Sequence, residues 1–195
     1  MLFDTHTHLH DPKFDEDREE VIEKIKASGV GALVNIGCDV MTSDYSVKLA
    51  RDYDFIYATV GVHPCDTDGM TEEHIEKIRQ LSKEKKVIAI GEIGLDYYWE
   101  PYDREQQIYC FEAQMEMARS LGLPVAIHDR EAHGDSFDVV CKYPDVRGVF
   151  HSYSGSAEMA KELIKRGWYI SFSGVVSFKN AAKVKEVAKV VPDDR

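Results

Sequence analysis

Residues 86–96 read Lys-Val-Ile-Ala-Ile-Gly-Glu-Ile-Gly-Leu-Asp, an apolar run that leads directly into a glutamate. Such a continuous apolar run is typical of a parallel strand that is buried on both faces. Glu92 follows it at once, and an unpaired buried carboxylate is costly. Metal coordination is a common way to compensate that charge, whereas a solvated loop glutamate is the simpler alternative. The segment therefore predicts a strand, Lys86–Glu92, with a candidate metal ligand at its carboxyl end.

Other short apolar runs alternate with amphipathic segments on both sides of this strand, as expected for repeated βα units. The full set of predicted strands is Leu2–His8, Gly31–Gly37, Phe55–Val62, Lys86–Glu92, Pro124–His128, Gly148–His151 and Tyr169–Phe172. The predicted helices are Asp15–Ser28, Thr71–Ser82, Arg104–Leu121, Ser156–Arg166 and Asn180–Val191. Two α/β architectures are compatible with this order, a doubly wound open sheet and a TIM-type (β/α) barrel.

The chain has 195 residues and shows no repeat, low-complexity tract or linker, so residues 1–195 are expected to form a single domain. Seven βα units are legible, whereas a complete (β/α)₈ barrel needs about 250 residues. The last predicted helix is followed only by Pro192-Asp193-Asp194-Arg195. A barrel domain that is C-terminally incomplete, without its eighth strand, is therefore expected.

Composition narrows the functional classes. The formal net charge is −11, which argues against a protein that coats long duplex DNA, because such proteins usually carry a basic face. No apolar run is long enough for a membrane span, and no signal peptide precedes the first strand, so a cytoplasmic protein without membrane contact is expected. The four cysteines are far apart, which disfavours both a zinc ribbon and a disulfide framework. No obligate protein partner is evident.

Five metal-competent residues stand at the carboxyl ends of predicted strands. His6 and His8 are two residues apart in the first strand, so their imidazoles project from the same face. His128 and His151 each follow an apolar run, as Glu92 does. Each histidine alone is also compatible with an incidental or buried core residue. In a TIM barrel, however, the carboxyl ends of all strands converge on the face that carries the active site, so these residues together predict a metal centre.

Two further polar residues belong to the same predicted face. His63 ends the third strand, and Arg130 lies two residues beyond His128. Both are candidates for contacts to a substrate phosphate, the arginine through bidentate hydrogen bonds. A turn histidine and a surface arginine are the alternatives. The aromatic residues 97–99 follow in the same region and could either stack on unpaired bases or pack the loop, and His10 is expected in a loop.

Taken in order, several motifs resemble the TatD-type metal-dependent deoxyribonucleases. The matching segments are Phe3-Asp4-Thr5-His6-Thr7-His8-Leu9, Gly61-Val62-His63-Pro64, Gly91-Glu92-Ile93-Gly94-Leu95-Asp96-Tyr97-Tyr98, Pro124-Val125-Ala126-Ile127-His128-Asp129-Arg130 and His151-Ser152-Tyr153-Ser154-Gly155. They cover nearly the whole chain. The resemblance implies a (β/α) barrel with two divalent metal ions bridged by Glu92, one held by His6 and His8 and the other by His128 and His151.

The implied activity is hydrolysis of phosphodiester bonds in DNA, exonucleolytic, on DNA ends or short single strands, by a water that two metal ions activate with Glu92 as the catalytic bridge. Imidazole and carboxylate ligands favour Zn, Mn, Ni or Co over Mg. The family also uses an aspartate after the eighth strand, which no residue here matches. Two alternatives therefore stay open: an amidohydrolase-type enzyme acting on amides or esters, and an inactive shortened relative.

Overall fold

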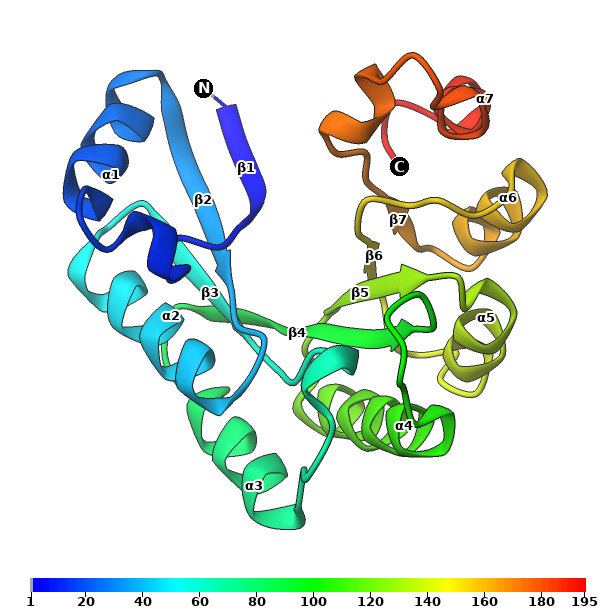
Figure 1. Cartoon of the computed structure of the whole chain (residues 1–195), viewed down its shortest axis with the longest axis horizontal. Helices are drawn as coiled ribbons and strands as arrows, with labels where there is room; N and C mark the ends of the chain where they lie inside the picture. The colour runs from blue at the N-terminus through cyan, green and yellow to red at the C-terminus, as the bar shows by residue number, and fades with distance from the viewer. Residues whose placement is uncertain (1) are drawn as a thin grey trace.

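The computed structural model describes residues 2–195, in which seven parallel strands form one sheet. The strands are β1 (Leu2–Thr7), β2 (Val30–Ile36), β3 (Ile56–Val60), β4 (Val87–Asp96), β5 (Val125–Arg130), β6 (Gly148–Phe150) and β7 (Tyr169–Ile170). Each strand pairs with the next one in the chain, so the order contains no reversal. A doubly wound sheet requires such a reversal. The fold is therefore the TIM-type alternative, with seven strands in a curled, partly open barrel (Figure 1).

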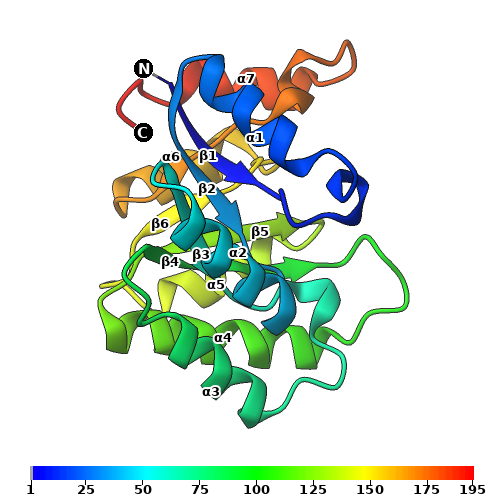
Figure 2. The ribbon, with the colours of Figure 1, turned by 90° about the vertical axis from the view of Figure 1, so that its left-hand side faces the viewer.

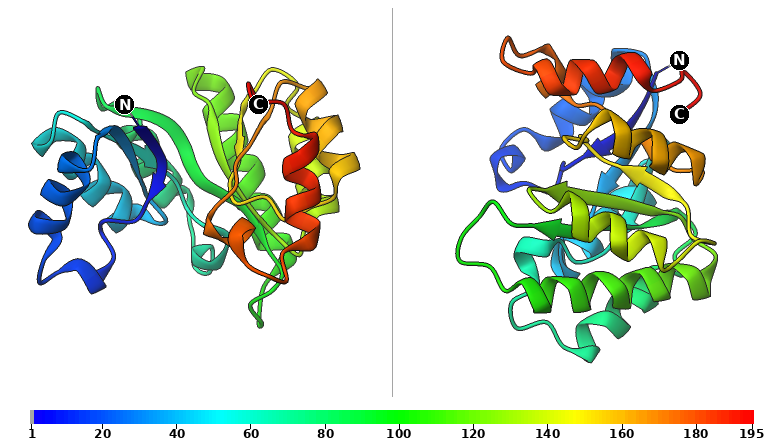
Figure 3. Two further views of the ribbon diagram at one scale, coloured as in Figure 1. Left: turned by 90° about the horizontal axis from the view of Figure 1, so that it is seen from above. Right: turned by 90° about the vertical axis from the view of Figure 1, so that its right-hand side faces the viewer.

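Helices connect the strands and lie on the outer side of the curled sheet (Figure 1). They are α1 (Arg18–Ala27), α2 (Val40–Asp52), α3 (Glu72–Leu81), α4 (Arg104–Leu121), α5 (His133–Cys141), α6 (Ala157–Lys165) and α7 (Ala182–Val190). Short 3-10 turns are η1 (Pro12–Phe14), η2 (Pro64–Asp66) and η3 (Gly174–Ser177). Figure 2 shows the first three helices in front of β1 to β4, and Figure 3 shows α4 to α7 from the other side.

Helices α2 and α5 are additional to the predicted set, and the structure explains why α2 lacks an obvious pattern. Its buried face carries Ser43 and Ser46 beside Val47, Leu49 and Ala50, so small polar residues interrupt the apolar stripe. The Ser43 hydroxyl accepts a hydrogen bond from Gly61 N at 3.1 Å, so a small polar residue lets the helix approach the strand end closely. The Asp39 side chain begins the helix by accepting from Thr42 N at 2.7 Å.

Strand β4 is longer than predicted, and this corrects the position of Glu92. The strand runs on to Asp96 because residues 93–96 pair with β5, where Asp96 lies opposite Arg130. The register between the two strands shifts between Ile90 and Ile93. Within that irregularity, Glu92 N donates to Gly37 O at 2.8 Å. Glu92 therefore lies inside the strand rather than at its end.

Strands β1 and β7 are the two edges of the sheet among residues 2–195. Leu2 and Phe3 on β1 are 65% and 56% exposed, in contrast to Ile56 and Ile90 on the interior strands β3 and β4, which are fully buried. On the other edge, Ile170 N donates to Arg195 O at 2.9 Å. The main core lies between the sheet and the helices, where Phe111 of α4 is fully buried. No helix within the described residues is long and apolar enough to cross a membrane.

Candidate metal centre

A cavity of about 640 Å³ opens at the carboxyl ends of the strands. Its walls include every residue that the sequence singled out for metal or substrate, namely His6, His8, His63, Glu92, His128, Arg130 and His151. These residues come from β1 and the residue just after it, the segment after β3, β4, β5 and the segment after β6. The curled sheet thus gathers side chains that are far apart in the sequence, as the common location of strand ends requires.

Three donor atoms converge at the β1 side of the cavity. His6 Nε2 lies 3.0 Å from His8 Nε2 and 3.3 Å from Glu92 Oε2. His8 Nε2 lies 3.8 Å from the same oxygen. Two ligands bonded to one tetrahedral zinc ion at 2.0–2.1 Å stand roughly 3.3 Å apart. The donor set and its spacing therefore fit a divalent cation between these three residues.

The second oxygen of Glu92 faces a different group. Glu92 Oε1 lies 3.0 Å from His128 Nδ1. One nitrogen of His63 joins these two residues, with all donor atoms within 4.8 Å of one another. His63 was considered for phosphate contact from its sequence position, and the structure places it close enough to serve as a metal donor. Each carboxylate oxygen of Glu92 thus has its own imidazole neighbours.

His151 reaches the cavity from beyond β6 and lies against His6. The two rings are stacked, with centroids 3.4 Å apart and planes inclined by 9°. Among residues 2–195, the compact donor groups contain His63 rather than His151 beside Glu92 and His128. His151 therefore lies on the wall between the two groups, and a role as ligand to the second metal ion stays a prediction.

Most of the imidazoles are held in the neutral form that binds metal. Burial lowers the pKa of His8 to about 4, and the neighbouring His6 adds to the effect. Burial likewise lowers the pKa of His63 and of His151 to about 4, with His128 and His6 as the next contributors. These three histidines are consequently unprotonated at neutral pH and can act as ligands without losing a proton.

Glu92 and His128 form a buried ion pair. Burial by itself would raise the pKa of Glu92, but hydrogen bonds from His128 and His6 outweigh it and hold that pKa well below its usual value. Burial would lower the pKa of His128, yet its bonds to Asp96 and Glu92 raise it to about 9. Glu92 is therefore ionised, and a metal ion that binds His128 has to displace its proton.

Asp96 contacts the candidate site, although the sequence analysis did not single it out as a site residue. Its side chain is fully buried, and Asp96 Oδ2 lies 2.9 Å from His128 Nε2. A carboxylate on the far nitrogen of a metal-binding histidine fixes the ring orientation and raises its basicity. The available signal was the even spacing from Glu92 to Asp96, which places both on one face of a strand.

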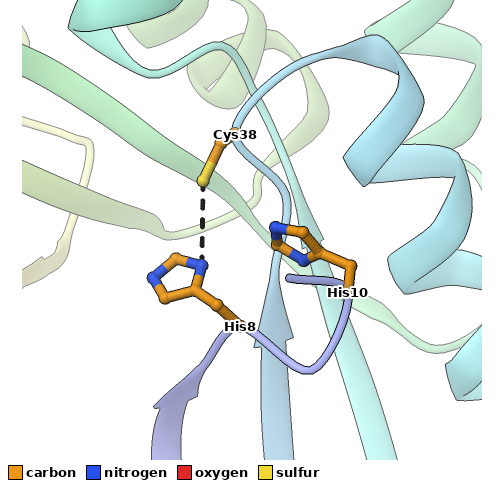
Figure 4. A group of neighbouring side chains, drawn as sticks. All are labelled: His8, His10 and Cys38. Atoms are coloured by element: carbon orange, nitrogen blue, oxygen red, sulfur yellow. Dashed lines mark hydrogen bonds between the residues drawn. The ribbon is translucent and has the colours of Figure 1, made fainter. Parts of the chain in front are cut away.

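Figure 4 shows a further cluster on the opposite side of His8. His8 Nδ1 faces Cys38 Sγ at 3.8 Å, and His10 stands beside them. The Asn35 amide accepts from Leu9 N at 2.7 Å through its oxygen and therefore turns its nitrogen toward His10 Nδ1 at 3.3 Å. Because the amide nitrogen of Asn35 can only donate, His10 Nδ1 accepts this bond and is engaged by Asn35.

The family model described as TatD related DNase matches residues 3–195. The chain belongs to this family. It is 45% identical to the uncharacterized metal-dependent hydrolase YabD of Bacillus subtilis, over all of this chain and 77% of YabD. It is 31% identical to the 3'-5' ssDNA/RNA exonuclease TatD of Cronobacter turicensis, over all of this chain and 75% of that protein.

Solved structures confirm the architecture of the TatD-family chain. The crystal structure of YjjV, a TatD homolog from Escherichia coli K12, superposes with a TM-score of 0.92 at 27% identity. The match covers 98% of this chain and 75% of YjjV. The phosphotriesterase homology protein of E. coli has the same fold at a TM-score of 0.67 and 15% identity. The chain is therefore a metal-dependent hydrolase of the TatD family with a TIM-type barrel.

Proposed function

We propose that this TatD-family chain hydrolyses phosphodiester bonds at the ends of single-stranded DNA, with two divalent cations bridged by Glu92. The observation that carries the proposal is the position of Glu92, whose two oxygens face separate imidazole groups at 3.3 Å and 3.0 Å. A relative at 31% identity is named a 3'-5' ssDNA/RNA exonuclease, which supports a nucleic-acid substrate.

The proposed ligand sets follow the two oxygens of Glu92. His6 and His8 hold one cation with Oε2. His128 holds the other with Oε1, and His151 completes this second set. The nitrogen-rich donors favour Zn, Mn, Ni or Co over Mg. When bound, the cations supply an activated water and neutralise the charge that develops on the phosphate.

Arg130 is the cation that the chain itself offers to the substrate. It lines the cavity on β5, two residues beyond His128. Its planar guanidinium can hold two phosphate oxygens at once. A cavity with one arginine suits an acidic protein, net charge −11, that meets only a few phosphates at a strand end. Arg130, with His63 beside His128, is proposed to position the scissile phosphate.

The direct test is nucleotide release. Metal-stripped protein is reloaded with Mn²⁺ or Zn²⁺ and incubated with single-stranded DNA labelled at either end, and products are resolved by length. We expect stepwise release of mononucleotides that stops when a chelator is added. Absence of release with every metal, together with turnover of a cyclic amide, would instead support the amidohydrolase-type alternative.

Arg130→Ala is expected to weaken substrate handling far more than metal binding. A charge-assisted hydrogen bond contributes about 1.5–3 kcal/mol, so kcat/KM on single-stranded DNA should fall about 10- to 100-fold. Metal affinity, measured by calorimetric titration of stripped protein, should stay within about threefold because Arg130 is outside both donor groups. Arg79→Ala on the outer helix α3 is the matched control. Equal losses in metal affinity and turnover would show that Arg130 acts on the metal centre instead.

A further inference from the structure

Two large aromatic side chains stand exposed in the loop between β4 and α4. Tyr98 is 51% and Trp99 is 59% exposed, and their rings meet edge to face with centroids 4.9 Å apart. Tyr97 and Tyr102 in the same loop differ, because they stack on each other at 4.9 Å and Tyr97 donates to Asp135 at 2.7 Å. Packing thus accounts for this second pair but leaves about half of the Tyr98 and Trp99 side chains exposed to solvent. Exposed apolar surface next to a catalytic cavity marks a binding surface.

The position of these two rings is tied to the metal centre. Asp96 Oδ1 accepts hydrogen bonds from Tyr98 N at 2.9 Å and from Trp99 N at 3.4 Å. The other oxygen of Asp96 contacts His128 Nε2 at 2.9 Å. One buried carboxylate therefore fixes both the backbone under the aromatic rings and the orientation of a candidate ligand. The rings are consequently held in a defined place relative to the site of phosphate cleavage.

Arg130 connects the aromatic rings with the catalytic cavity. Its guanidinium carbon lies 3.7 Å from the centroid of the Tyr98 ring and 5.3 Å from that of Trp99. Arg130 also lines the catalytic cavity, while Trp99 lines a neighbouring hollow of about 690 Å³. A phosphate bound by Arg130 would thus leave the adjoining nucleoside beside Tyr98 and Trp99. Guanidinium groups and aromatic rings together are the usual components of single-strand recognition.

We infer that Tyr98 and Trp99 form a stacking platform for the unpaired base of the nucleotide next to the phosphate held by Arg130. The inference rests on the proposed phosphodiesterase function and specifies its substrate class as single-stranded. A base in a duplex has both faces covered by its stacked neighbours. An unpaired base has a face available and can stack on the platform. The platform binds a base through buried contact area and π stacking, so it adds affinity without adding positive charge to this acidic protein.

The fluorescence of Trp99 reports the proposed contact directly. The chain has two tryptophans, and Trp168 is buried at 1% exposure, so Trp99 is the accessible one. Zn²⁺-loaded protein is titrated with a short thymidine oligonucleotide whose phosphorothioate links resist cleavage. We expect saturable quenching, no quenching in Trp99→Phe, and none with an oligonucleotide of the same length that carries abasic sites. Quenching that is the same with the abasic strand overturns the platform.

Steady-state kinetics provide the second readout. Stacking on an aromatic side chain strengthens binding about 5- to 100-fold per base, so Trp99→Ala should lower kcat/KM on single-stranded DNA by that factor. Trp99→Phe should retain most of the wild-type rate, and on the abasic strand Trp99→Ala should match wild type. Tyr109→Ala is the matched control, since Tyr109 is an aromatic residue of α4 with 52% exposure that lines neither hollow.

The outcomes distinguish failure of the stacking platform from failure of the proposed nuclease function. Normal cleavage of base-bearing DNA by Trp99→Ala overturns the platform and leaves the nuclease proposal standing. Base-dependent quenching without any nucleotide release supports the platform as a single-strand binding surface while it removes the nuclease proposal. An equal loss on base-bearing and abasic strands also overturns the platform, because a general disturbance of the loop does not depend on bases.

Discussion

Replacing Glu92 with alanine is expected to abolish metal-dependent hydrolysis. The carboxylate is 3% exposed and faces His6 through one oxygen and His128 through the other. Its removal takes a ligand from both proposed cations and leaves several imidazoles facing each other in a buried cavity. A metal ion contributes several kcal/mol to such a reaction, so kcat/KM should fall on the order of a thousandfold. Metal content after dialysis, measured by elemental analysis, should fall as well.

Two variants make the Glu92 result specific. Glu92→Gln keeps the shape but removes the charge, so it should also lose most activity if the carboxylate bridges two cations. His10→Ala removes an imidazole near the site whose Nδ1 is occupied by Asn35, and it should change the rate by less than about threefold. A wild-type rate for Glu92→Ala at saturating metal would refute the role assigned to this residue.

Among glycine-to-alanine substitutions in this chain, Gly94→Ala is expected to be the most damaging. Gly94 has φ +140°, a backbone conformation that alanine rarely adopts, and a Cβ there would lie 2.0 Å from His128 O. The strand that carries His128 would have to move away from β4. The strain and the displacement together should cost at least about 3 kcal/mol of unfolding free energy, and the metal centre should lose its geometry.

Urea denaturation and metal titration measure the two parts of the Gly94 effect. Gly134→Ala is the matched control. Gly134 lies in helix α5, and a Cβ at this position meets nothing within 4 Å. This control should be neutral or slightly stabilising, since alanine is the better helix former. A Gly94→Ala protein with unchanged midpoint and unchanged metal affinity would contradict the close contact between β4 and β5.

The histidine-rich strand ends could be recognised from the sequence because strand periodicity and barrel geometry are general rules. His6 and His8 share a face by the alternation of a strand, and all strand ends of a barrel meet at one rim. That reasoning requires no knowledge of side-chain packing. It therefore predicted an α/β fold of repeated βα units and a group of residues that line one cavity in the structure.

Other features depend on tertiary contacts that the sequence pattern does not encode. The length of β4 is set by pairing of residues 93–96 with β5, and its apolar run ends before that point. The buried face of α2 mixes two small serines with apolar residues, and Ser43 fits a close approach to Gly61, so its apolar stripe is interrupted. The distribution of His63 and His151 around Glu92 follows from how the loops approach the cavity, which spacing along the chain cannot give.

The stacking of His6 on His151 has a consequence for how the protein assembles. The two rings belong to β1 and to the segment after β6, so the centre exists only after most of the barrel has folded. Closing such a long stretch of chain carries an entropic cost, and cations bridged by Glu92 between the two ligand sets would act as a cross-link that is formed late. Metal binding should thus slow unfolding more than it accelerates folding, so that the metal ions stabilise the folded barrel kinetically.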